Sequence, residues 1–182
     1  FLNYELGLGN TEQMKKTFST SMTAHISLAL LLLLLAESVG LWFVNTQLRI
    51  PADRIAAANW VYQFSILTFM VNIIRVPYNA SIIAYERMSF YAYLSIVEVT
   101  LKLAAVYLLV ISKWDKLIYY SALMFAVPLL CNIIYRGYCR RKFDTCVYTS
   151  CWDKKLYFRM IGFSGWSMVG GATTIGTQQG GN

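Results

Sequence analysis

Residues 22–44 read MTAHISLALLLLLLAESVGLWFV, and this stretch decides the fold of the chain. Its only ionisable side chains are those of His25 and Glu37. A transmembrane helix needs roughly 20 apolar residues, because the hydrocarbon core is about 30 Å thick and a helix rises about 1.5 Å per residue. A helix in the core of a soluble domain has no need for that length. The stretch therefore predicts a helix that spans a membrane.

Further apolar stretches of similar length follow at residues 59–84, 90–111 and 117–135, and a Gly-rich one begins at residue 160. Of the 182 residues, 57% are hydrophobic and only 14% are charged, whereas soluble domains carry about 25% charged residues. Backbone groups in lipid must be paired internally, and the alternation typical of barrel strands is absent. We therefore expect an all-α, polytopic transmembrane bundle with four full spans and the start of a fifth.

The connections between the predicted spans are short, which makes consecutive spans antiparallel neighbours. Residues 85–89 and 112–116 are tight turns, and residues 45–58 form a longer loop. Pro51 is expected in the first turn of the second helix, where proline is tolerated. Pro77 lies inside that helix and should kink or loosen it, because proline removes a backbone donor.

Lysine and arginine are distributed unequally between the two sides of the predicted bundle. One side carries ten: Lys15, Lys16, Arg87, Arg136, Arg140, Arg141, Lys142, Lys154, Lys155 and Arg159. The other carries four: Arg49, Arg54, Lys113 and Lys116. The richer side of a membrane protein is usually cytoplasmic. Residues 1–21 are then a cytoplasmic lead-in, residues 136–159 a basic cytoplasmic loop, and residues 45–58 an outer loop.

Cysteine spacing and net charge argue against metal and nucleic-acid binding. The cysteines are Cys131, Cys139, Cys146 and Cys151; their spacing matches no zinc pattern, and the chain has one histidine. We expect reduced thiols, no metal and no cofactor. The net charge of +7 comes from residues beside apolar blocks, which is the pattern of membrane topology rather than of a nucleic-acid partner.

Charged residues at bilayer depth mark the candidate site, since each costs about 2.5–3.5 kcal/mol on insertion scales. Glu98 and Lys102 lie four residues apart in the third span, in the order that suits an ion pair. They belong to a polar stripe made of Tyr91, Ser95, Glu98 and Lys102. The second span has a similar stripe made of Ser65, Thr68, Asn72, Arg75 and Asn79. His25 and Glu37 are interpreted as structural or interfacial.

Two adjacent helices, each with a polar stripe that contains a cation, predict a shared hydrophilic cavity. Such a cavity favours an anionic or hydroxyl-rich ligand. The alternative is that these groups only hold the helices together through buried hydrogen bonds. Arg75 has no opposite charge within four residues on its own helix, so we expect it to bind an anionic headgroup while Glu98 and Lys102 mainly hold each other.

Four segments of the chain resemble a known family. They are ELGLGN at residues 5–10, KTFSTS at 16–21, AESVGLWF at 36–43 and VPYNASIIA at 76–84. In these segments, and in the run that joins them, the chain resembles bacterial polysaccharide-biosynthesis membrane proteins, the O-antigen or lipid-linked oligosaccharide flippases. These belong to the MATE-like superfamily of multidrug, oligosaccharidyl-lipid and polysaccharide exporters. The resemblance covers essentially the whole chain.

The resemblance implies about a dozen helices or more in two pseudo-symmetric lobes. Residues 22–135 would then hold four helices of the N-terminal lobe, residues 136–159 the inter-lobe loop, and residues 160–182 the truncated start of the next helix. Because the chain starts at Phe1 rather than Met, and its last apolar stretch has only just begun, we expect a piece of a longer protein.

The function that the resemblance implies is transport rather than catalysis. The protein would flip polyprenyl-pyrophosphate-linked oligosaccharide across the bacterial inner membrane by alternating access. Its partners would be this substrate, membrane lipids and other polysaccharide-assembly proteins. An ion-coupled drug or small-solute exporter of the same fold is the alternative, and Glu98 is then the only central carboxylate available to it. A membrane-bound glycan-processing enzyme is less expected, because the outer loops are small.

Overall fold

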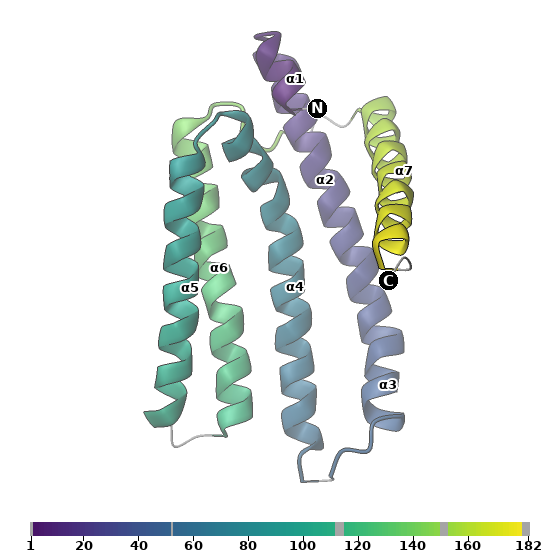
Figure 1. Ribbon diagram of the computed structural model, residues 1–182, viewed down its shortest axis with the longest axis vertical. Helices are drawn as coiled ribbons and strands as arrows, with labels where there is room; N and C mark the ends of the chain where they lie inside the picture. Colours follow the sequence, from purple (N-terminus) through teal and green to yellow (C-terminus); the bar gives the residue numbers. More distant parts are fainter. Residues whose placement is uncertain (1, 52, 112–114, 150–152, 180–182) are drawn as a thin grey trace.

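Helices make up all the regular structure in the described part of the chain. The computed structural model describes residues 2–51, 53–111, 115–149 and 153–179. The elements are α1 (Leu2–Gly7), α2 (Thr11–Leu35), the π-helical turn η1 (Ala36–Gly40), α3 (Leu41–Thr46), α4 (Ile55–Ala84), α5 (Met88–Ile111), α6 (Lys116–Lys142) and α7 (Lys154–Gln179). Figure 1 shows α5, α6, α4 and α2 standing side by side, with α7 against α2.

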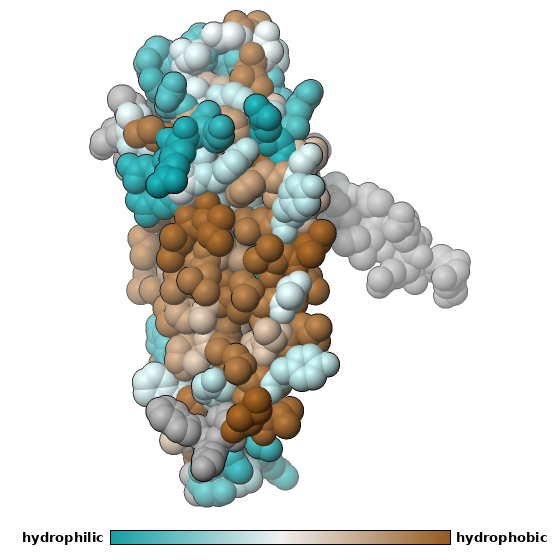
Figure 2. Space-filling view, turned by 90° about the vertical axis from the view of Figure 1, so that its left-hand side faces the viewer, coloured by the Kyte–Doolittle hydropathy of each residue, from teal (hydrophilic) through white to brown (hydrophobic). Residues whose placement is uncertain are grey.

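Four helices of the described part are long and apolar enough to cross a membrane, which confirms the four predicted spans. They cover Thr11–Thr46, Ile55–Ala84, Met88–Ile111 and Lys116–Lys142. Their apolar side chains point outward; Leu34 is 71% exposed and Ile111 is 78% exposed. Figure 2 shows the result, a hydrophobic band between two hydrophilic ends. Outward-facing apolar residues are what a surface in contact with lipid requires.

Helix α2 begins earlier than the apolar pattern indicates, so part of the expected lead-in at residues 1–21 is helical. Gly9 has a φ of +67°, and Asn10 then caps α2 by accepting a hydrogen bond from the Gln13 backbone N–H at 3.0 Å. The first turns carry buried polar side chains, among them Thr17 and Thr20. Hydropathy does not predict that this polar segment is helical and buried, because its burial comes from packing against the rest of the bundle.

The first span does not continue as a regular α-helix but widens into the π-helical turn η1. Tyr62 of α4 donates a hydrogen bond to the Ala36 carbonyl at 2.7 Å. Gly40 lies so close to this hydroxyl that a Cβ would collide with it. The π turn and its glycine therefore let α2 and α4 approach one another. Nothing in the apolar spacing predicts this turn.

The start of α4 also differs from the expectation. Pro51 is not in the first turn of α4; it belongs to a preceding turn in which its carbonyl accepts a hydrogen bond from the Arg54 N–H at 2.8 Å, and α4 begins at Ile55. Pro77 lies inside α4, and the helix ends at Ala84 as expected. The turn expected at residues 112–116 falls mainly on residues 112–114, outside the described residues.

Helix α6 runs seven residues beyond residue 135, where its span was expected to end. It ends at Lys142, so the first part of the expected loop 136–159 is helical. Basic side chains in the last turn of a helix interact favourably with its dipole, which explains the extension. Helix α7 begins at Lys154, ahead of residue 160, and is not among the four candidate spans of the described residues. The fifth span stays a prediction.

Aromatic packing joins the helices at the end of the bundle where α6 terminates, which we call the basic end. The rings of Phe18 and Tyr78 lie 5.5 Å apart between centroids, and those of Phe90 and Tyr138 lie 3.6 Å apart. Tyr85 stacks on Phe143 at 4.0 Å. These contacts join α2 to α4, α5 to α6, and the segment after α6 to the end of α4. They fix the relative positions of the helices that carry the candidate site.

Candidate functional site

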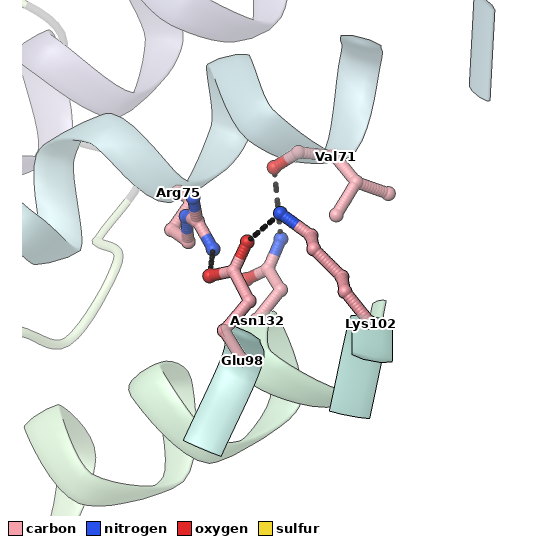
Figure 3. A network of polar contacts seen from close by, with 5 residues as sticks. All are labelled: Val71, Arg75, Glu98, Lys102 and Asn132. Carbon is pink, nitrogen blue, oxygen red and sulfur yellow. Dashed lines mark hydrogen bonds and ion pairs between the residues drawn. The ribbon is translucent and has the colours of Figure 1, made fainter. Parts of the chain in front are cut away.

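Three charged side chains from neighbouring helices form one network inside the spans. Arg75 of α4 places Nη1 2.7 Å from Oε2 of Glu98 on α5. Lys102 of α5 places Nζ 2.7 Å from Oε1 of the same carboxylate. Figure 3 shows Glu98 between the two cations, one oxygen facing each. The predicted Glu98–Lys102 pair is therefore confirmed.

Arg75 has no opposite charge near it on its own helix, as the sequence indicated, but the expectation that Glu98 and Lys102 mainly hold each other is incomplete, because Glu98 also bonds Arg75. It rested on the spacing within one helix, and Glu98 reaches Arg75 from the next helix. The side chains of Arg75 and Glu98 are 18% and 14% exposed, whereas that of Lys102 is 42% exposed. The Arg75–Glu98 contact is thus the more sheltered of the two ion pairs.

Helix α6 completes the site with two residues that the sequence reasoning missed. Asn132 donates a hydrogen bond to the Val71 carbonyl of α4 at 3.1 Å, as Figure 3 shows. Tyr135 places its ring 5.6 Å from the guanidinium carbon of Arg75, within cation–π range. A polar Asn132 inside an apolar span, three residues before Tyr135, was the available signal, because such a residue usually faces the bundle interior.

A recess of about 210 Å³ lies beside this network. Its walls come from all three helices: Arg75, Asn79, Tyr91, Ser95, Glu98, Val99 and Tyr135. The predicted cavity residues are the two polar stripes without Ser65, and five of these eight share one recess. The buried Oδ1 of Asn79 has no hydrogen-bond partner within the described part of the chain. An amide oxygen left this way is available to a hydroxyl or amine donor.

The other three predicted cavity residues do not line the recess. In the described part of the chain, Lys102 is bonded to the network only through Glu98. The Thr68 hydroxyl donates to the Phe64 carbonyl of its own helix at 2.7 Å, and Asn72 is not among the lining residues. Ser65 also bonds its own helix, through the Val61 carbonyl at 2.8 Å. The polar stripe on α4 thus divides into residues that face the recess and residues bonded to their own backbone.

Two cations share one carboxylate, so the network carries an excess of one positive charge. Arg75 has five N–H donors, and within the described residues only one acceptor, Glu98, is bonded to it. Its remaining donors, the excess charge and the low dielectric of the spans all favour an anion. The planar fork of an arginine matches the geometry of phosphate oxygens better than the point charge of a lysine does.

The cysteines give no sign of metal chemistry in the described part of the chain. No group of three or more His, Cys, Asp or Glu side chains is placed to hold an ion there. Cys131, Cys139 and Cys146 are free and buried, and Cys151 lies outside the described residues. The Cys139 thiol donates to the Tyr78 carbonyl at 3.9 Å. Cys139 thus contributes to the packing of α6 on α4.

Comparison of the chain with protein-family models, with curated proteins and with solved structures finds no match. The described residues define the class of molecule, a bundle of helices suited to a membrane, with an ionic network inside it.

Proposed function

We propose that this chain is part of a transporter that flips polyprenyl-pyrophosphate-linked oligosaccharide across the bacterial inner membrane. The observation that carries the proposal is the recess beside Arg75, Glu98 and Lys102, where one excess positive charge meets uncharged polar side chains inside the spans. A pyrophosphate needs cations, and sugars need hydroxyl and amide partners. The sequence resemblance to lipid-linked oligosaccharide flippases supports the same assignment.

In this proposal Arg75 is the residue that binds the anionic headgroup. A phosphate oxygen entering the recess takes up the guanidinium donors that Glu98 leaves free. Glu98 stays hydrogen-bonded to Lys102, so that cation does not compete with Arg75 for the phosphate. The side chains of Asn79, Ser95 and Tyr91 then contact the first sugar through hydrogen bonds.

The size of the recess limits what this chain binds by itself. Ligand pockets usually measure about 300–1,000 Å³, and this recess measures about 210 Å³. It suits a headgroup-sized fragment and leaves an oligosaccharide outside. We propose that a second lobe supplies the facing wall, and that rocking of the two lobes moves the ligand across by alternating access.

An ion-coupled drug or small-solute exporter of the same fold is the second candidate. Such a transporter needs a carboxylate that exchanges protons or sodium in its cavity. Glu98 is the central carboxylate here, and it is bonded to two cations. Protonating it would strand both cations inside the spans, at a high electrostatic cost. The network therefore favours an anion-binding role over ion coupling.

The test is surface-glycan export in cells that depend on this protein, with protein abundance measured in parallel. Arg75→Ala should abolish export at normal abundance, and Arg75→Lys should restore it only in part, because lysine lacks the planar fork. Arg54→Ala is the matched control: Arg54 also pairs with a carboxylate, Asp115 at 3.0 Å, but it is 57% exposed and far from the recess. Normal export by Arg75→Ala would show that Arg75 does not bind the headgroup. Loss of abundance would instead show that the network serves to hold the helices together.

A further inference from the structure

The outward side of α6 changes from apolar to basic over its last four turns. Leu130 is 51% exposed, Ile133 is 61% exposed and Ile134 is 44% exposed. Arg136 and Arg140, one and two turns further on, are exposed as well. Figure 2, which faces the side of α5 and α6, shows the hydrophobic band giving way to hydrophilic residues toward this end.

These apolar and basic residues lie on one side of the helix. Ile133 lies three and four residues before Arg136 and Gly137, and these two lie four residues before Arg140 and Arg141, the spacing that repeats on one helical face. From Ile133 to Arg140 the helix rises about 10 Å. A lipid lying along α6 would therefore meet aliphatic side chains first and arginines at the height of its headgroup.

The arginines on this face have no carboxylate partner within the described part of the chain. Arg54 and Arg75 each pair with a carboxylate, whereas no ion pair of Arg136, Arg140 or Arg141 is present. The helix dipole favours cations in the last turn only. It accounts for Arg140 and Arg141, which lie in that turn, and not for Arg136.

Gly137 leaves open space among these arginines. A Cβ built on it meets no atom within 4 Å. A phosphate can therefore approach the helix backbone between Arg136, Arg140 and Arg141. A glycine inside an exposed helix costs about 1 kcal/mol relative to alanine, and no close packing against another element requires it here.

We propose that this face of α6 is a binding site for an anionic phospholipid of the adjacent leaflet. The headgroup phosphate lies over Gly137 between Arg136, Arg140 and Arg141, and the acyl chains lie along Leu130 and Ile133. Charge complementarity selects this occupant, since unpaired basic residues next to a span attract anionic headgroups. The site is separate from the recess and does not depend on the proposed transport function.

The experiment titrates the purified full chain in detergent with phosphatidylglycerol, and native mass spectrometry counts the lipids that remain bound. Arg136→Gln with Arg140→Gln should weaken binding by at least about tenfold. Lys15→Gln with Lys16→Gln is the matched control, because it removes two cations from the same end of the bundle. Its affinity should stay within about twofold of the unchanged chain. Phosphatidylcholine should bind the unchanged chain far more weakly.

A second variant keeps every charge. Because a Cβ at position 137 meets no atom within 4 Å, Gly137→Trp should fold, and its indole should displace the bound phosphatidylglycerol. Unimpaired binding by Gly137→Trp would overturn the proposal. It would mean that the basic residues attract anionic lipid without a defined site, which needs no free space at Gly137. An equal loss in the two double-substituted chains would overturn it as well. If the arginine variant fails to fold, as judged by its helical circular dichroism, Gly137→Trp alone decides.

Discussion

At the scale of single residues, the site depends on Glu98 more than on either cation. Its two oxygens serve Arg75 and Lys102 separately, each at 2.7 Å. Removing Glu98 strands two cations, whereas removing Lys102 leaves the sheltered Arg75–Glu98 pair intact. Breaking a buried pair is costly mainly because the remaining charge stays unpaired. Glu98 therefore holds α4 and α5 together while it leaves Arg75 partly free.

Exchanging the two charges on α5 tests this arrangement. Glu98→Lys with Lys102→Glu keeps the pair within the helix but places a lysine beside Arg75. We expect the exchange to be no better tolerated than Glu98→Gln alone, because two cations then repel one another in the spans. Both should lower the free energy of unfolding in detergent by about 1–3 kcal/mol. Lys102→Gln should cost less, since Lys102 is 42% exposed and its long stem reaches polar surroundings.

Sequence reasoning finds contacts within a helix and misses contacts between helices. The four-residue spacing was enough to predict the Glu98–Lys102 pair. The Arg75–Glu98 pair depends on how far α4 and α5 are rotated about their axes, which spacing does not determine. Tyr135 was missed for the same reason, since its partner comes from another helix. Whether the recess binds a ligand stays a proposal.

At the scale of elements, the spans were predictable and their ends were not. Apolar runs located all four helices, because a helix that spans lipid must be apolar over its whole length. The ends are set by local groups: Asn10 caps α2, and Asp115 caps α6 by accepting from the Leu117 N–H at 2.9 Å. The π turn at Ala36–Gly40 depends on a contact with Tyr62 of α4. Hydropathy carries no information about such contacts.

The contact between the π turn and α4 makes a prediction about Gly40. Gly40→Ala should lower the free energy of unfolding by about 1–3 kcal/mol, because the new Cβ collides with the Tyr62 hydroxyl. Tyr62→Phe in the same chain removes that hydroxyl and should recover part of the loss. Gly137→Ala is the matched control: its Cβ meets nothing within 4 Å, so it should not destabilise the chain. Unfolding in detergent measures all three, and a Gly40→Ala chain as stable as the control would contradict the contact.

At the scale of the whole molecule, charge asymmetry predicts orientation in the membrane. The basic end carries Arg87, Arg136 and the cations of the last turn of α6, and the opposite end carries fewer. The basic end should face the cytoplasm. In a chain without its native cysteines, Ile50→Cys should react with an impermeant thiol reagent added outside, and Lys142→Cys should not. Reaction of Lys142→Cys alone would reverse the orientation.

The arrangement of the spans also predicts that this chain does not transport when it is the only protein present. Alternating access requires two bodies that move against one another around a ligand, and among the described residues the recess has walls from α4, α5 and α6 only. A headgroup bound to Arg75 would then stay accessible from the same side of the membrane, because no movement would open the recess to the other side. Purified chain in vesicles should bind labelled lipid-linked saccharide but should not carry it across the bilayer.

The measurement is the fraction of label that an added glycan-binding protein captures from outside. Arg75→Ala serves as the binding control. Capture that rises with time in the unchanged chain, above protein-free vesicles, would show that the four spans complete a transporter and would remove the need for a second lobe.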